Sequence, residues 1–221
     1  MNLMPGQKKK SVLIIYIIVF YFVWTVFEFF IKDAIDSLIP NNVLSQIVKS
    51  GIIKNLVWTV PAFILISKFC VCFTLKEMFT TKVNALKYLP LFILFTVYLL
   101  IGAIWEKGEL VLAKDFGADE IIIVLFVGLT EEMVFRGWLL NATITKENKW
   151  KCIILNAVMF LAIHFPSWIY NGVFIRNFEE FGFVSVVVLS AIFSLTFMKS
   201  RNILIPITLH MHWDLLMFMF Y

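Results

Sequence analysis

The chain has 221 residues, of which 61% are hydrophobic and only 15% are charged, and its mean hydropathy is +0.91. Soluble domains carry about 25% charged residues, so this composition excludes an ordinary soluble globular domain and indicates a protein surrounded by lipid. The net charge of +4 is spread over short basic clusters between apolar runs, which argues against nucleic-acid binding.

The apolar residues are gathered in long runs, each near the roughly 20 residues that a spanning helix needs. They predict an all-α, polytopic transmembrane helical bundle with seven spans, at 11–31, 55–73, 88–105, 121–143, 152–170, 183–199 and 203–221. Lys49 and Lys54 interrupt residues 41–60, and an eighth span within 38–60 is the alternative. Pro61 is expected to kink the second span.

The charges between the spans predict how the chain lies in a cell membrane, expected to be a bacterial plasma membrane. One set of connections is basic and contains Lys8, Lys9, Lys10, Lys76, Lys82, Lys87, Lys146, Lys149, Lys151, Lys199 and Arg201, with Glu77 and Glu147 as its acidic residues. The opposite connections carry more acidic than basic residues, including the stretch from Glu106 to Glu120. The positive-inside rule then places the N-terminus in the cytoplasm and the C-terminus outside. The first run is too long for a signal peptide and lacks a small-residue cleavage site, so we expect a retained span.

The cysteines and the charges of the first half predict little chemistry. Cys70, Cys72 and Cys152 form no disulfide framework and no zinc-ligand spacing, and we expect them to be small buried hydrophobic residues. Glu28 and Lys68 lie near the ends of their spans, where we expect both at the membrane interface.

Polar residues within spans are concentrated in the second half, which predicts N-terminal transmembrane helices over 1–116 and a functional core over 117–221. A charge at the centre of a membrane helix costs roughly 2.5–3.5 kcal/mol. Glu132 and Arg136 are four residues apart and share a helix face, so they can pair. Glu131 points about 100° away and stays available as a base. The alternative is an ion pair that only packs helices.

Three histidines follow, and two of them complete the pattern. His164 lies late in the fifth span, and His210 and Asp214 share a face of the last span. A His and an Asp on one face can bind a metal, orient a base or form hydrogen bonds to a polarised carbonyl group. Two carboxylates and two histidines from three helices can converge on one water molecule, as peptide hydrolysis requires. His212 points to the opposite side and is expected to be structural.

The series Glu131-Glu132-x-x-x-Arg136, Phe160-x-x-x-His164 and His210-x-x-x-Asp214 resembles the motifs of the CPBP family of intramembrane proteases. That family includes the type II CAAX prenyl endopeptidases and the bacterial abortive-infection-type (Abi) and bacteriocin-immunity-type membrane proteins. The resemblance covers about residues 117–221.

The resemblance implies a role for each matching residue. Glu131 would activate water with the help of His164, while Glu132, Arg136 and Phe160 support the site. His210 and Asp214 would stabilise the oxyanion, or would complete a zinc-like divalent metal site with His164. The family varies between Asn and Asp at the last position, and an ionised Asp214 cannot donate to an oxyanion, which favours a metal-ligand or His-orienting role. Ser185, Ser190, Ala191 and Ser194 supply small residues for helix packing.

We therefore predict an intramembrane endopeptidase, with a membrane peptide or protein as substrate and the lipid bilayer as its surroundings. A pheromone, a bacteriocin or a membrane sensor protein is as plausible a substrate as a prenylated CAAX protein. The alternatives are a non-catalytic bacteriocin self-immunity or scaffold protein, and a proton-coupled transporter. One difficulty is depth, since the spans place His164 nearer the outside and His210 nearer the cytoplasm than Glu131. Tilt, helix offset or a break at Pro166 would absorb this difference.

Overall fold

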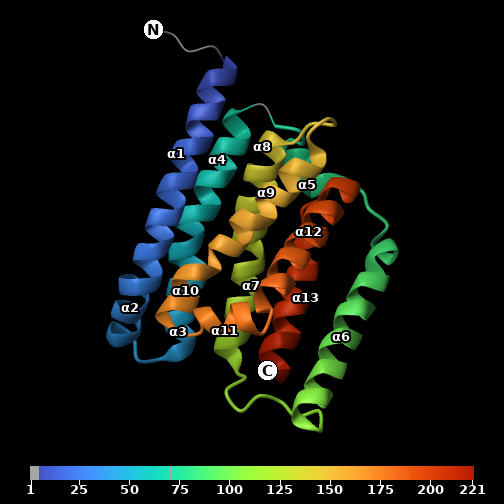
Figure 1. The fold of residues 1–221 in the computed structure, drawn as a ribbon. Coiled ribbons are helices and arrows are strands. Elements are labelled where there is room, and N and C mark those ends of the chain that lie inside the picture. Colours follow the sequence, from blue (N-terminus) through green and yellow to red (C-terminus); the bar gives the residue numbers. More distant parts are fainter. Residues whose placement is uncertain (1–4, 70) are drawn as a thin grey trace.

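The computed structural model describes residues 5–69 and 71–221, the first four of these by backbone alone, and Cys70 lies outside the described residues. Within this part of the chain every regular element is a helix, which confirms the predicted all-α class (Figure 1). Five helical segments are long and apolar enough to cross a membrane: Lys9–Leu38, Asn42–Lys68, Ala85–Lys107, Lys149–Tyr170 and Gly182–Ser200.

Consecutive elements join end to end into longer helical rods, such as α1–η1–α2 and α3–η2–η3–α4, which run up and down the bundle (Figure 1). The first half contains α1 (Pro5–Val26), η1 (Phe27–Ile31), α2 (Lys32–Leu38), α3 (Asn42–Gln46), η2 (Ile47–Ile53), η3 (Asn55–Thr59), α4 (Val60–Lys68), α5 (Leu75–Thr80), η4 (Ala85–Tyr88) and α6 (Leu89–Lys107). The second half contains α7 (Ala118–Glu132), η5 (Met133–Leu140), α8 (Asn141–Thr143), α9 (Lys149–Ala162), α10 (His164–Tyr170), α11 (Phe174–Glu179), α12 (Gly182–Ser200) and α13 (Leu204–Phe220). Elements η1, η2, η3 and η5 are π-helical, and η4 is a 3₁₀ helix.

Each of the seven predicted runs overlaps one of these rods, but two of the rods are not typical membrane spans. The rod α7–η5–α8 carries Glu131, Glu132 and Arg136 in its middle, and α13 is only 17 residues long. Crossing of the membrane by these two rods, and hence the total of seven, stays a prediction.

The predicted boundaries of the second span are wrong. Its helix begins at Asn42, where the Asn41 side chain accepts a hydrogen bond from the Leu44 amide and caps the helix. It continues to Lys68, so residues 42–60 form one rod with residues 61–68 and no separate eighth span. The helix also continues through Pro61. The turns before it, η3, are π-helical, and proline removes one hydrogen-bond donor from the helix at that point.

An aromatic core joins the two halves of the chain. Trp24 of α1 and Trp58 of η3 lie 4.9 Å apart between ring centroids, and Phe20 of α1 lies 5.8 Å from Phe135 of η5. All four side chains are buried in one hydrophobic cluster. The N-terminal helices therefore support η5, the element that directly follows the adjacent glutamates. The predicted functional boundary near residue 116 stays a prediction.

One expectation for a residue of the first half is wrong, and another is not tested. Glu28 is 5% exposed, because it faces the bundle and lies 3.6 Å from Lys32 Nζ, and its expected place at the membrane interface stays a prediction. Cys72 is exposed, because it lies in the connection between α4 and α5 and not in a span. Lys68 is exposed, as expected, and Cys152 is partly buried.

The first turn of α1 and the C-terminus lie at opposite ends of the bundle, which we call its N-terminal and C-terminal ends (Figure 1). Near the N-terminal end, Asn202 donates to the Thr81 carbonyl oxygen at 2.8 Å. This bond joins the connection between α12 and α13 to the connection between α5 and η4. Near the C-terminal end, the Ala113 amide donates to the Met219 carbonyl oxygen at 2.8 Å. This bond fastens the connection between α6 and α7 to the last turn of α13.

Candidate active site

Glu132 and Arg136 form a buried ion pair where α7 passes into η5, and π-helical turns of this kind are frequent at functional sites. Neither side chain is exposed, and Arg136 Nη1 donates to Glu132 Oε1 at 3.0 Å. Arg136 Nη2 also donates to the hydroxyl and the carbonyl oxygen of Ser190 on α12, at 2.8 and 3.1 Å. The predicted pairing is confirmed, and it connects the α7–η5 rod to α12.

Two aromatic rings enclose this ion pair. The guanidinium carbon of Arg136 lies 4.5 Å from the centroid of Phe160 and 5.4 Å from that of Phe193. The Phe160 ring also lies 5.8 Å from the His210 ring, and Phe193 stacks on the same imidazole at 5.0 Å. Because the rings keep water away, the charges attract each other more strongly than they would at a protein surface.

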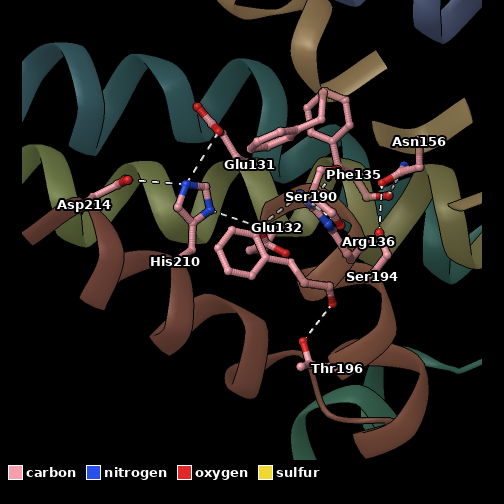
Figure 2. Close-up of polar contacts among 12 residues, drawn as sticks. Glu131, Glu132, Phe135, Arg136, Asn156, Ser190, Ser194, Thr196, His210 and Asp214 are labelled. Carbon is pink, nitrogen blue, oxygen red and sulfur yellow. Dashed lines mark hydrogen bonds and ion pairs between the residues drawn. The ribbon is translucent and has the colours of Figure 1, made fainter. Parts of the chain in front are cut away.

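His210 on α13 connects the ion pair to the groups around it, as Figure 2 shows. Its Nδ1 atom lies 2.9 Å from Glu132 Oε1. Since an ionised carboxylate only accepts hydrogen bonds, Nδ1 is the donor, and Glu132 fixes the orientation of the ring. The Nε2 atom lies on the other side of the ring, 3.4 Å from Asp214 Oδ2 and 3.9 Å from Glu131 Oε2.

Glu131 has different surroundings from its neighbour Glu132, because successive side chains on a helix point about 100° apart. It is 7% exposed and faces Nε2 of His210. One turn earlier on α7, Gly128 allows α13 to approach. A Cβ atom at this position would lie 2.8 Å from Met211 Cγ. The glycine therefore lets α7 and α13 bring Glu131 and His210 together.

His164 is the first residue of α10, directly after the break at Ile163 that ends α9. Its Nδ1 atom lies 2.9 Å from the Phe160 carbonyl oxygen, which can only accept, so Nδ1 donates and Nε2 remains for other partners. The helix breaks before His164 and not at Pro166. Pro166 lies in the first turn of α10, where its missing N–H is not needed.

A cavity of about 630 Å³ brings the predicted catalytic residues together, since Glu131, His164, His210 and Asp214 all contribute to its lining. The predicted supporting residues Glu132, Arg136 and Phe160 are buried behind these four. The predicted difference in depth does not keep these residues apart, because Glu131 and His210 face each other and His164 lines the same cavity.

Sequence reasoning missed the contributions of two residues, Trp168 and Ser190. Trp168 lines the cavity, and its ring lies 5.7 Å from that of His164. Ser190 is expected from the sequence only as a small residue, although a polar side chain in an apolar span could have suggested a partner for Arg136. His212 points away from the cavity and lies 2.8 Å from Thr96 Oγ1 on α6, as predicted for a structural residue.

The structure does not test the predicted metal site. Among the described residues, no three His, Cys, Asp or Glu side chains form a group that could hold a metal ion. Glu132 and the Phe160 carbonyl oxygen hold the Nδ1 atoms of His210 and His164, an arrangement that metal-binding histidines also use. A zinc-like ion held by His164, His210 and Asp214 stays a prediction.

Residues 118–216 match the family described as Type II CAAX prenyl endopeptidase Rce1-like. The match covers all three motifs and confirms the resemblance to the CPBP family. At the level of the family it supports a protease, and together with the apolar helices it indicates a multi-pass membrane protein. Comparisons with curated proteins and with solved structures give no match.

Proposed function

Since residues 118–216 match a family of membrane endopeptidases, we propose that the chain hydrolyses a peptide bond in a membrane-associated peptide or protein. The observation that carries this proposal is the convergence of Glu131, His164, His210 and Asp214 on one cavity. Ionisable side chains are costly inside a membrane and are rarely kept there for packing alone, so four of them around one space favour a functional site.

Glu131 is the general base of this proposal. Glu132 is neutralised by Arg136, whereas the Glu131 carboxylate faces the cavity and can accept a proton from a water molecule. His164 lines the same cavity, and in this proposal its Nε2 atom positions that water. The water oxygen attacks the carbonyl carbon of the substrate, and Glu131 passes the proton to the amine as the carbon–nitrogen bond breaks. General acid–base catalysis of this kind contributes typically 10²–10⁴-fold.

His210 and Asp214 stabilise the negative charge that develops on the substrate carbonyl oxygen. Glu132 holds the Nδ1 side of the ring, so a proton on Nε2, shared with Asp214, can be donated to the oxyanion. This division of roles accommodates an Asp at the last motif position. The carboxylate binds the histidine, and the histidine donates to the substrate.

The proposal includes an orientation, with the N-terminus in the cytoplasm and the C-terminus outside. It rests on the basic connections at the N-terminal end of the bundle and the acidic connections at the other end.

Two histidines on the same helix offer a matched test. Wild type, His210→Ala and His212→Ala would be expressed at equal levels, and processing of co-expressed membrane peptides would be followed by mass spectrometry. We expect His210→Ala to lose roughly 10²–10³-fold in processing and His212→Ala to stay within about twofold. If His212 were essential and His210 dispensable, the proposed site would be wrong. Equal biological activity from all three proteins, without cleavage products, would favour a binding or immunity role.

A further inference from the structure

The cavity has a buried end and an exposed end. At the buried end, His210 and Glu131 are 6% and 7% exposed. The lining then follows α13 through Met217 to Tyr221, which is 41% exposed. Asp115, in the connection between α6 and α7, is also an exposed lining residue. The mouth therefore lies at the end of the bundle that holds the C-terminus (Figure 1).

The charges of the two ends place this mouth on the non-cytoplasmic side. The connections at the far end carry Lys76, Lys82, Lys146 and Arg201, and hydrogen bonds such as that from Asn202 to Thr81 hold two of these connections together. The end with the mouth is rich in acidic residues from Glu106 to Glu120. Basic connections stay in the cytoplasm, so the cavity opens on the opposite side.

The lining of the cavity is negatively charged. Asp115 and Glu120 lie near the mouth, and Glu131 and Asp214 lie deeper. Among the described residues, no lysine or arginine contributes to the lining. Lys114 is exposed beside Asp115 but does not line the cavity, and Lys107 Nζ donates to the Phe220 carbonyl oxygen at 2.7 Å. A peptide with acidic residues would be repelled at this mouth, whereas one with lysine or arginine would be attracted.

We infer that the cavity receives a cationic peptide segment that reaches the membrane from the non-cytoplasmic side. This inference rests on the proposed protease function for what happens after binding. The side of entry and the charge preference follow from the cavity itself and can be measured without cleavage.

Entry from the non-cytoplasmic side is tested with two exposed lysines at opposite ends of the bundle. Lys114→Cys, next to the mouth, and Lys146→Cys, in the connection between α8 and α9, would each be made after the native cysteines are replaced by serine. Intact cells would be treated with a membrane-impermeant maleimide, and lysed cells would serve as the reference. We expect Lys114→Cys to be labelled in intact cells and Lys146→Cys only after lysis. The reverse pattern, or equal labelling of both in intact cells, would overturn the inference.

The charge preference is tested by binding, so that a failure of catalysis does not obscure it. The probes are two apolar peptides of equal length, one flanked by lysines and the other by glutamates, added to the detergent-solubilised full chain. We expect the lysine-flanked peptide to bind about tenfold more tightly. Asp115→Asn with Glu120→Gln should remove most of this preference.

Glu179→Gln with Glu180→Gln is the control, because these acidic residues lie at the same end but outside the cavity lining. The preference should survive in this variant. Equal binding of both probes to wild type, or binding of neither, would contradict the inferred ligand. Tight binding of the cationic probe without cleavage would instead count against the proposed protease function.

Discussion

Removing Arg136 should destabilise the protein far more than removing an arginine in an exposed pair. Arg136→Ala leaves the fully buried Glu132 with the His210 ring as its one remaining partner among the contacts described above, and it also removes the guanidinium from between Phe160 and Phe193. Breaking a buried ion pair on one side costs about 3–5 kcal/mol, a large part of the 5–15 kcal/mol that typically holds a protein folded. For a chain of this size, the midpoint of thermal unfolding should fall by roughly 6–20 °C.

The assay is thermal unfolding of the purified protein in detergent, together with its abundance in the membrane. The chain contains a matched control in Arg176→Ala. Arg176 and Glu180 are also four residues apart, but their side chains are 66% and 71% exposed and their charged atoms lie 4.0 Å apart. Surface pairs contribute little, so this variant should unfold near the wild-type temperature.

A double variant separates the effect on stability of a Glu132 charge without Arg136 from the effect of the lost Arg136 packing. Glu132→Gln with Arg136→Met removes both charges and keeps much of the side-chain volume, so most of the lost stability should return. If Arg136→Ala unfolds at the wild-type temperature, the pair does not contribute as its burial indicates. If the double variant is as unstable as Arg136→Ala, lost packing against Phe160 and Phe193 is the cause, and the argument from charge is refuted.

Three further outcomes follow from the same contacts. Gly128→Val should separate α7 from α13, which should lower the free energy of unfolding by about 1–3 kcal/mol and reduce processing. Unchanged processing would show that the close approach of the two helices is dispensable. Asn141→Ala should lower membrane abundance, because Asn141 bonds to both the amide and the carbonyl oxygen of Phe73 and an unpaired buried group costs about 1–3 kcal/mol. Processing per folded molecule should be preserved. The proposed hydrolysis uses Glu131 as the base and His210 at the oxyanion without a metal, so chelators should leave processing intact. A loss of processing that zinc restores would contradict this proposal and favour the predicted metal site.

The pairings that depend on helical periodicity alone could be predicted from the sequence. The spacing of four residues places Glu132 against Arg136 and Asp214 beside His210, and both contacts are present. It also turns His212 away, toward Thr96. These relations hold because residues four apart share a helix face whatever the helix packs against.

The contacts that depend on how helices pack could not be predicted in this way. One example is the hydrogen bond from His210 Nδ1 to Glu132 instead of Glu131. It depends on the offset of α13 along α7 and on the space left by Gly128. The start of the second rod at Asn42 was hidden because Lys49 interrupts the apolar pattern. The structure shows that Lys49 is buried and bonded to Asp36, at 2.6 and 2.7 Å. Burial of a paired lysine is not visible in a hydropathy pattern.

The most direct test of the proposed hydrolysis is a comparison of wild type with Glu131→Gln at equal expression, with membrane peptides analysed by mass spectrometry. Glutamine keeps the size of the side chain but cannot take a proton from water, so catalysis should fall by roughly 10²–10⁴-fold while the fold is retained. Cleavage products that appear only with wild type would agree with Glu131 as the general base. The same products from both proteins, in equal amounts, would contradict that role.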